Sequence, residues 1–476
     1  SGMWEDFTLL GRTVISGDVI SPIADQVYTG RAVEPDVTVT VGGIKLTKDD
    51  DYTASYTNNI NPGRATVTIM GIGDYTGTKS VSFTIKNNWL ASSDISWYDE
   101  KKPSYTITTN EQLAGIASLV NSGSADMMGK TITVSSDIDL TGAEWTPIGT
   151  ESNPFNGTLD GKGSSINGLV TSSDISNTGF IGATNREAVV QNITISADVK
   201  GMNNAAVLVG LNNGTIINCK TGGASSGGQN IGGIAGLNNG IIRSCVSETN
   251  VTGTENAGGI AGSNSETVQN SVSAGNVSSA GNAGGIVGSN RGTVNMTDAV
   301  GKTTGAAAGG ITGYNSGAVS GSNWLKDSGG SPAAGSGTGD PVSGDCKGYD
   351  AGELSEMPTV CVLLNNLTIT SDRNGSFTIT AASYPTTSDA QITFEAEGVT
   401  FTPPAISADG TPKTVKASGG ANSSYTVTIK NAAGEKLAEF KLTNKAPRGG
   451  SGGCNSGFAA LAALSVIPVV MRRKKK

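Results

Sequence analysis

A short phrase ending in glycine is written five times between Ala205 and Trp324, and its spacing constrains the fold more than any other feature. The phrase reads Gly-Ile-x-Gly, with Val-Leu-Val-Gly as its first copy. The last glycines of the five copies are 26, 26, 26 and 25 residues apart and are Gly210, Gly236, Gly262, Gly288 and Gly313. A fixed period of this length is typical of a solenoid, in which each repeat stacks on the last.

Alignment of the five copies gives two columns of aliphatic residues. The first stands two residues before each glycine and comprises Leu208, Ile234, Ile260, Ile286 and Ile311. The second stands six residues after each glycine and comprises Ile216, Ile242, Val268, Val294 and Val319. Because these positions are apolar in every copy, we expect both columns to face the core.

A column of asparagines stands two residues past each glycine: Asn212, Asn238, Asn264, Asn290 and Asn315. Parallel rungs stack about 4.8 Å apart, so each side-chain amide can donate to the carbonyl of the next. Helical repeats offer no such ladder, and the Gly, Asn, Ser and Thr that fill these repeats are poor in helix interiors. We therefore predict an all-β chain with one β-coil per repeat.

The repeated phrase, followed by an Asn, a Gly and an aliphatic residue, resembles the GLUG motif. This motif is a repeat of bacterial surface proteins, including adhesins and the non-catalytic part of immunoglobulin A1 peptidases. The resemblance covers residues 205–324, where the regular repeats lie. Upstream, residues 145–149, 155–157 and 159–161 resemble the opening coils of such proteins, and residues 179–182 resemble a degenerate first copy. We predict a β-solenoid over residues 103–326.

One short helix is predicted at the start of this solenoid. Residues 109–112 read Thr-Asn-Glu-Gln, a capping-box pattern, and Asn-Ser-Gly at 121–123 is a stop signal. Between them Leu113, Ile116, Ala117, Leu119 and Val120 recur at helical spacing. We expect the helix to cover the open first rung, because a solenoid end exposes unpaired backbone and apolar core.

Two flanking segments alternate apolar and polar residues with period two, which predicts a small β-sandwich at residues 13–87 and another at 358–445. The phrase over residues 51–77 resembles bacterial Ig-like surface modules. A segment rich in Gly, Ser and Pro predicts a flexible linker at 327–357, between the solenoid and the second sandwich.

The C-terminal residues 449–476 predict a sorting signal with a short membrane helix. The apolar run from Phe458 to Met471 has 14 residues, and the chain ends in five cations. Such a helix is about 21 Å long, short of a hydrocarbon core of about 30 Å. The cations place the end of the chain in the cytoplasm and everything before Cys454 outside. An ordinary one-pass anchor that is never cut is the alternative.

Residues Ser451, Gly452, Gly453 and Cys454 resemble the Synergist-type C-terminal sorting domain, which is related to GlyGly-type signals. The resemblance implies cleavage by a rhomboid-family, sortase-like protease and membrane contact through the tail before that cleavage. We also expect an upstream signal peptide that is missing before Ser1.

Composition excludes several classes of function. The 476 residues include no histidine, which removes Ser-His and Cys-His nucleophile systems and the zinc motif with two histidines on a helix. A net charge of −8 without basic clusters, apart from the tail, argues against nucleic acid. The five cysteines have no metal-ligand spacing, and we expect no cofactor. Cys219 and Cys245 should lie on adjacent rungs, either as stacked thiols or as a disulfide.

These features predict a non-enzymatic bacterial cell-surface protein, of adhesin-like or surface-display type, whose ligand is an unknown host or matrix protein or glycan. A polysaccharide-active β-helix enzyme, a lyase or a hydrolase, is one alternative, because such enzymes can use carboxylates in place of histidine. Its candidate carboxylates are Asp137, Asp139, Asp160, Glu248, Glu255 and Glu266. A purely structural surface spacer is the other alternative.

Overall fold

The computed structural model describes residues 11–16, 20–28, 31–171, 175–326, 335–350, 353, 361–369, 376–384, 391–407, 413–418, 424–432, 434 and 436–443. The described part of the chain is all-β, with 56% of its residues in strands and 5% in helices. Across these ranges, no helix is long and apolar enough to cross a bilayer. The predicted membrane and sorting helix at 449–476 lies outside the described residues.

The first of two compact units comprises Ser1–Ser93 with Gly142–Thr146. Its main sheet has the order β2-β8-β6-β5. The strands of this unit are β1 (Thr13–Val14), β2 (Gln26–Val27), β3 (Thr40–Val41), β4 (Ile44–Lys45), β5 (Tyr52–Thr57), β6 (Gly63–Gly71), β7 (Tyr75–Thr76) and β8 (Thr78–Lys86), followed by the 3-10 helix η1 (Trp89–Ser92). Alternate residues of β6, Ala65, Val67 and Ile69, are fully buried, as the period-two pattern predicts.

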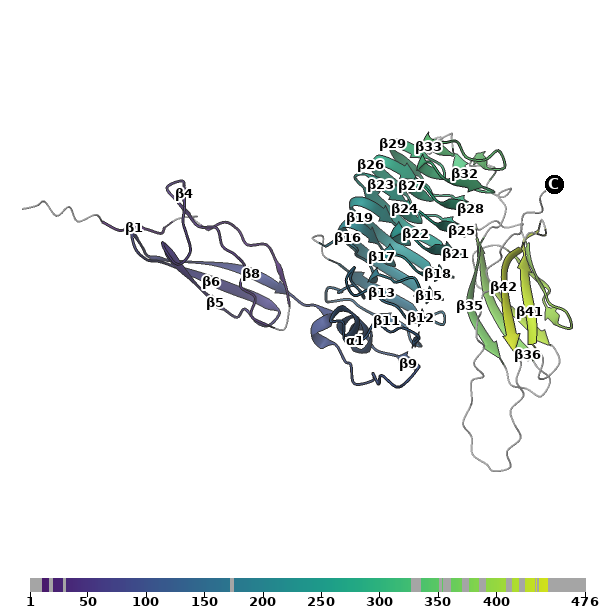
Figure 1. Cartoon of the computed structure of the whole chain (residues 1–476), viewed down its shortest axis with the longest axis horizontal. Coiled ribbons are helices and arrows are strands. Elements are labelled where there is room, and N and C mark those ends of the chain that lie inside the picture. Colours follow the sequence, from purple (N-terminus) through teal and green to yellow (C-terminus); the bar gives the residue numbers. More distant parts are fainter. Residues whose placement is uncertain are drawn as a thin grey trace, which may run out of the picture. The chain divides into compact units, whose positions relative to one another are not determined.

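The second unit contains the β-solenoid, which has about nine turns. One of its sheets runs through β14 (Ile181–Ala183), β17 (Val209–Asn212), β20 (Ala235–Asn238), β24 (Ala261–Asn264), β27 (Val287–Asn290), β30 (Thr312–Asn315) and β33 (Ser336–Gly339). Every pairing in this sheet is parallel, and each strand pairs with the equivalent strand of the next coil. Figure 1 shows these strands stacked along the solenoid.

The remaining solenoid strands form its other walls, again with parallel pairing between coils. They are β9 (Ser104–Ile107), β10 (Thr131–Val134), β11 (Ile138–Asp139), β12 (Thr158–Asp160), β13 (Ser165–Val170), β15 (Val189–Gln191), β16 (Thr194–Ala206), β18 (Thr215–Ile217), β19 (Lys220–Gly232), β21 (Ile241–Arg243), β22 (Val246–Gly253), β23 (Asn256–Gly258), β25 (Thr267–Ser273), β26 (Val277–Gly284), β28 (Thr293–Ala299), β29 (Thr303–Gly309), β31 (Ala318–Ser320), β32 (Asn323–Lys326) and β34 (Lys347–Asp350). The predicted solenoid of one β-coil per repeat is therefore confirmed.

Both aliphatic columns form the solenoid core. Ile234, Ile260 and Ile286 are fully buried, and so are Ile242 and Val268 of the second column. The backbone N–H of Ile234 donates to the carbonyl of Ile260 at 2.9 Å, and that of Ile260 donates to Ile286 at 2.9 Å. Identical side chains therefore stack on one another from coil to coil.

The motif glycines let neighbouring coils approach closely. A Cβ placed on Gly236 would lie 2.4 Å from the carbonyl carbon of Asn204, and one on Gly262 would lie 2.3 Å from that of Asn230. Real Cβ atoms do not approach backbone atoms this closely, so only glycine fits. The repeated Gly-Ile-x-Gly phrase is thus a packing requirement of the coil.

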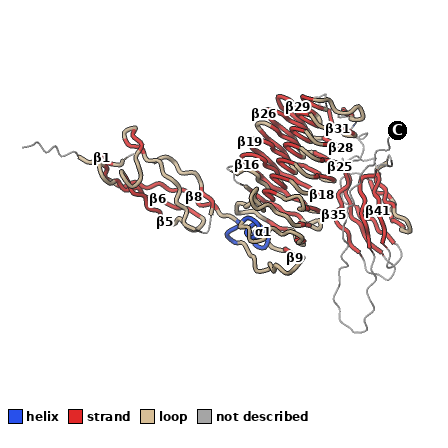
Figure 2. The backbone as a smooth tube through the Cα atoms, viewed as in Figure 1, coloured by secondary structure: helices blue, strands red, loops and turns tan. Residues whose placement is uncertain are grey.

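The helix α1 (Asn110–Asn121) has the predicted bounds and cap, since the side chain of Thr109 accepts a hydrogen bond from the backbone N–H of Gln112. Figure 2 shows it as a single blue coil beside the red strands, at the end of the solenoid where β9 lies. Its apolar residues Leu113, Ile116 and Val120 are buried. The helix thereby removes an apolar face from water at the first rung.

The predicted linker at 327–357 is wrong over part of its length. Strand β33 pairs with β30, and β34 pairs with β32, so residues 335–350 add one more rung and the described solenoid extends to Asp350. A strand pairs through its backbone, which small residues leave open, and the ring of Trp324 packs on Gly335 and Gly348. Composition therefore misrepresented this segment as a flexible chain.

The C-terminal segment forms two antiparallel four-stranded sheets. One contains β35 (Cys361–Ile369), β36 (Ser376–Tyr384), β40 (Lys413–Ser418) and β38 (Thr400–Thr402), and the other contains β39 (Ala405–Ser407), β37 (Gln391–Glu395), β41 (Ser424–Lys430) and β42 (Lys436–Thr443). Phe394 and Val427 of one sheet share a buried cluster with Phe401 and Val415 of the other. The two sheets therefore enclose a common core.

Candidate functional site

The five predicted asparagines are brought together in one continuous ladder. The Nδ2 of Asn212 donates to Oδ1 of Asn238 at 2.7 Å, and Asn238 donates to Asn264 at 2.7 Å. The contacts from Asn264 to Asn290 and from Asn290 to Asn315 are both 2.9 Å. All five side chains are buried, so these amides interact with one another and not with solvent.

This ladder also closes each turn and is satisfied at both ends. The Nδ2 of Asn238 donates to the carbonyl of Gly240 at 3.0 Å, two residues along its own coil. At one end the hydroxyl of Thr184 donates to Oδ1 of Asn212 at 3.0 Å. At the other end Asn315 donates to the carbonyl of Asp340 at 3.1 Å. Asp340 belongs to the last described rung, residues 335–350, which lies within the predicted linker at 327–357. Buried amides are costly when unpaired, so the closed ends matter for stability.

A second ladder runs in the opposite direction and was missed from the sequence. It comprises Asn177, Asn204, Asn230, Asn256 and Asn282, with each amide donating to the previous rung at 2.8 to 3.0 Å. The signal was present, because four of these asparagines stand six residues before a motif glycine. Asn204 and Asn230 have φ of 51° and 57°, a left-handed conformation that asparagine tolerates better than most residues.

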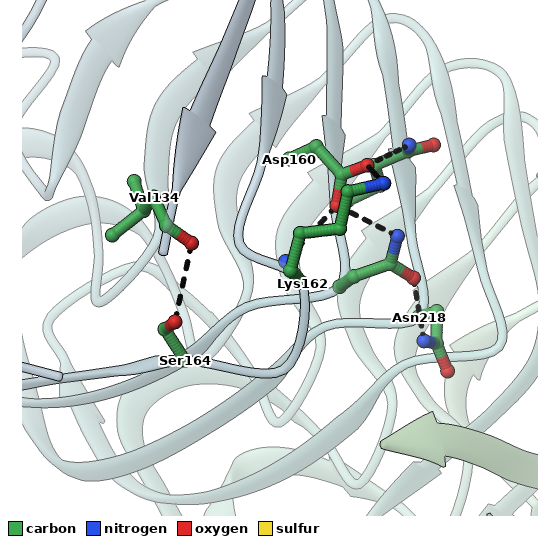
Figure 3. A network of polar contacts seen from close by, with 7 residues as sticks. Val134, Asp160, Lys162, Ser164 and Asn218 are labelled. Atoms are coloured by element: carbon green, nitrogen blue, oxygen red, sulfur yellow. Dashed lines mark hydrogen bonds and ion pairs between the residues drawn. The ribbon is translucent and has the colours of Figure 1, made fainter. Parts of the chain in front are cut away.

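A third, shorter ladder ends on the carboxylate of Asp160 (Figure 3). Asn218 donates to Asn192 at 2.7 Å, and Asn192 donates to Oδ1 of Asp160 at 2.9 Å. The other carboxylate oxygen accepts from Gln191 at 3.0 Å and forms a 2.8 Å ion pair with Lys162. The ladder therefore terminates in a charged acceptor.

The pKa of Asp160 reflects this setting. Burial alone raises its pKa, but hydrogen bonds from Lys162 and Asn192 and the positive charge of Lys162 outweigh burial and bring the pKa below its usual value. Asp160 is therefore ionised at neutral pH and fully engaged with the coil. It lacks the raised pKa expected of a general acid.

The other candidate aspartates also hold the coil together. Oδ1 of Asp137 accepts from the backbone N–H of Ser165 at 2.7 Å, and hydrogen bonds from Ser165 lower the pKa of Asp137. Oδ1 of Asp139 accepts from the backbone N–H of Thr141 at 2.9 Å. Asp139 therefore caps a local turn, whereas Asp137 links two neighbouring coils, and both roles are structural.

The three candidate glutamates lie at different places along the coils, Glu248 in β22, Glu255 before β23 and Glu266 before β25. Glu248 forms a 2.8 Å ion pair with Lys220, and Glu255 accepts from Nε2 of Gln229 on the previous rung. The backbone carbonyl of Glu266 accepts a hydrogen bond from the Nδ2 of Asn264. The Glu248 and Glu255 contacts link neighbouring coils, and the Glu266 contact closes a turn within its own coil.

Cys219 and Cys245 are buried thiols on adjacent rungs and form no disulfide. The Sγ of Cys219 lies 3.2 Å from the carbonyl oxygen of Ile217, and the Sγ of Cys245 lies 3.2 Å from that of Arg243. Burial, and next the neighbouring Cys245 thiol, raise the pKa of Cys219 well above its usual value. A thiol with a raised pKa is unreactive, so Cys219 packs as a small apolar side chain.

The predicted processing residues Ser451, Gly452, Gly453 and Cys454 lie outside the described residues. Of the predicted site residues, the structure describes the five asparagines of the first ladder.

No family model matches this chain. Among curated proteins it is similar to Halomucin of Haloquadratum walsbyi, with 37% identity over 81 residues. These residues are 17% of this chain and 1% of Halomucin. The match therefore covers only a small part of either protein.

Proposed function

We propose that this chain is a non-enzymatic cell-surface protein of the GLUG-repeat type, in which a stiff solenoid presents a binding surface. The continuous asparagine ladder from Thr184 to Asp340 carries the proposal. A structure whose polar groups are satisfied within and between rungs resists local opening, and that suits a protein exposed to proteases and shear. The likeness to Halomucin is compatible with an extracellular location.

The remaining parts have roles in this proposal that follow from the sequence. The flanking β units at 13–87 and 358–445 act as Ig-like spacer arms. The segment 449–476 acts as a sorting signal that a rhomboid-family, sortase-like protease cuts. The ligand is a host or matrix protein or a glycan, bound on the exposed strands of the solenoid.

Two measurements test the proposal. Intact cells of the native host are treated with a reagent that cannot cross membranes, and we expect the chain to be labelled without lysis. Full-length chain is then applied to glycan and matrix-protein arrays, where we expect saturable binding. Labelling only after lysis contradicts the surface role, and labelling without any binding supports the spacer alternative.

A third measurement addresses the enzymatic alternative. Incubation with acidic and neutral polysaccharides should release no new reducing ends and no unsaturated products. Turnover that Asp160→Asn abolishes would contradict the proposal and identify the Asp160 network as an active site. Asp137→Asn is the matched control, because Asp137 is also a carboxylate that accepts a hydrogen bond from a neighbouring coil.

A further inference from the structure

The solenoid contains six Asn-x-Ser/Thr triplets, which are acceptor sequences for N-linked sugars. Their asparagines are Asn156, Asn192, Asn213, Asn250, Asn276 and Asn295. Attachment requires a side-chain nitrogen that reaches solvent and is not already bound within the fold. The structure separates the six by this criterion.

Two of the six are buried. Asn156 is 5% exposed and Asn192 is 8% exposed. The Nδ2 of Asn192 donates to Asp160 at 2.9 Å within the third ladder, and that of Asn156 approaches Asp126 at 3.5 Å. A sugar on either nitrogen would have to occupy space that the coil fills.

Two more are half-buried and have their nitrogens engaged. The Nδ2 of Asn213 donates to the carbonyl of Thr184 at 2.9 Å. The Nδ2 of Asn295 donates to the hydroxyl of Ser320 at 2.8 Å. Both nitrogens would have to leave a hydrogen bond to the neighbouring coil before they could react.

Asn250 and Asn276 differ from these four. Both are exposed, and they lie on adjacent rungs. Oδ1 of Asn250 accepts from the backbone N–H of Asn276 at 3.1 Å, and Oδ1 of Asn276 accepts from that of Lys302 at 3.1 Å. The next rung thus holds each amide by its oxygen, and neither Nδ2 donates to any residue that the structure describes.

The hydroxyl residues of both triplets lie on the same face as the asparagines. Thr252 and Ser278 stand two residues along their strands, pair in register across β22 and β26, and are exposed. The residue paired with Asn250 on the preceding rung is the small Ala224. Both acceptor triplets are therefore presented side by side on an open face.

We propose that Asn250 and Asn276 form a paired N-glycosylation site on this face of the solenoid. The sugar donor is a lipid-linked oligosaccharide pyrophosphate. The Nδ2 forms a bond to the anomeric carbon while the bond from that carbon to the phosphate oxygen breaks. The electron pair leaves with the lipid pyrophosphate, and the amide proton passes to a base of the transferase.

Adjacent rungs are about 4.8 Å apart, which is close to the width of one sugar ring. Sugar on one asparagine therefore crowds the other, and we expect one glycan per chain, on either residue. The inference rests on the surface location proposed above, because the acceptor must meet a donor displayed outside the cytoplasm.

Mass spectrometry of full-length protein from its native host tests the site. Cleavage after Lys, Arg and Glu places Asn250 on the peptide 249–255, Asn276 on 267–291 and the buried Asn192 on 188–200. We expect sugar mass on the first two peptides and none on the third. In the undigested chain we expect the mass of one glycan and never of two. Both acceptor peptides found entirely at their sequence mass would overturn the inference, as would sugar on 188–200.

Matched variants show whether sugar attachment depends on the acceptor triplet or only on the exposure of the two asparagines. Thr252→Ala with Ser278→Ala destroys both triplets without touching either asparagine and should abolish the added mass. Thr252→Ser with Ser278→Thr keeps both triplets and should retain it. Sugar that persists in the double alanine variant is not N-linked at this site and overturns the proposal.

Surface labelling of the same cells separates this inference from the proposed function. Unmodified chain that is labelled on intact cells contradicts the glycosylation site and leaves the surface role standing. Unmodified chain that is labelled only after lysis contradicts both.

Discussion

At the scale of single residues, buried polar side chains define the solenoid as much as its apolar core does. Three amide ladders run through the coils, and each amide depends on a neighbour on the next rung. Removing one member leaves partners on both sides without a hydrogen bond, and the cost depends on their burial. Several buried polar atoms depart from this satisfied pattern, and Oδ2 of Asp298 is one of them.

Asn264→Ala tests the first ladder. The change removes the acceptor of Asn238 and the donor to Asn290, and we expect a loss of about 1 to 3 kcal/mol for each buried group left unpaired. Calorimetry of the full chain should show a lower Tm for the solenoid transition. Thr252→Ala, at an exposed position, is the control and should shift stability by less than about 0.5 kcal/mol. Equal Tm values for the two variants would contradict a stabilising ladder.

Asp298 predicts a pH-dependent stability. It is fully buried, Asn323 donates to its Oδ1 at 2.8 Å, and its Oδ2 has no partner. Burial raises its pKa to about 8, although the hydrogen bonds from Asn323 oppose the shift. The contribution of the protonated Asp298 carboxyl to stability is therefore complete below the pKa of the unfolded chain and is lost as pH rises towards 8. Over that range the free energy of unfolding should fall by about 1.4 kcal/mol per pH unit.

The variant Asp298→Asn removes this titration. The Tm of the wild type relative to the variant should fall steadily between pH 5 and pH 8. Parallel curves over that range would show that the carboxyl does not titrate in the fold.

At the scale of elements, the coil is defined by what stacks on its inner face. Ile260 lies between Ile234 and Ile286, and the motif glycines admit the backbone of the neighbouring turn. Packing at these positions is therefore sensitive both to lost volume and to added volume.

Ile260→Ala should cost about 2 to 5 kcal/mol, because the side chain is fully buried and the rigid rungs cannot close the cavity. Ile260→Val removes a single methylene and should cost only about 0.5 to 1.5 kcal/mol. Urea unfolding of the full chain, followed through the solenoid transition, measures both. A loss under about 1 kcal/mol for the alanine variant would contradict an inward position.

Gly262→Ala adds a single methyl group where none fits. Its Cβ would lie 2.3 Å from a backbone carbon of Asn230, so we expect a loss of about 1 to 3 kcal/mol or more. Gly222→Ala is the matched control in the same solenoid, since a Cβ there meets nothing within 4 Å. Thermal melts should separate the two variants clearly, and similar melts would show that the coils can move apart.

At the scale of the whole molecule, the proposed role depends on export and anchoring. If the tail is cut near Cys454, the mature chain loses five cations and no acids, and its net charge changes from −8 to −13. The apolar run of 14 residues contains Pro468, which weakens a membrane helix and makes permanent anchoring poor.

Mass spectrometry of surface-displayed protein should therefore find a C-terminus at Gly453 or Cys454. Cys454→Ala should retain the uncut tail and change the location of the chain, whereas Cys346→Ala should do neither. An intact tail on the displayed wild type would show that the segment is only an anchor. Unchanged mass and location in Cys454→Ala would remove the cysteine from the mechanism.

Much of the solenoid could be predicted from the repeat alone. A residue in a coil meets its equivalent 25 or 26 positions later, so the sequence alignment of the copies is also their spatial alignment. The core column at Ile260, the ladder through Asn264 and the cap of α1 depend on local or periodic signals of this kind. The second ladder follows the same period at Asn230 and Asn256, so it too is encoded in the repeat.

Other features required the tertiary structure because they depend on particular neighbours. Residues 335–350 read as a linker by composition, yet the backbone edge of β30 and the ring of Trp324 convert them into a rung. The burial of Asp298 also could not be predicted, because nothing in the sequence of its strand marks this carboxyl as buried. Asn192 and Asn250 each begin an Asn-x-Thr triplet, so the sequence does not distinguish them. In the folded coil the Nδ2 of Asn192 donates a structural hydrogen bond, whereas Asn250 is held by its Oδ1 and its Nδ2 stays free. Periodicity thus determined what stacks on what, whereas solvent access to each polar atom was decided by three-dimensional packing.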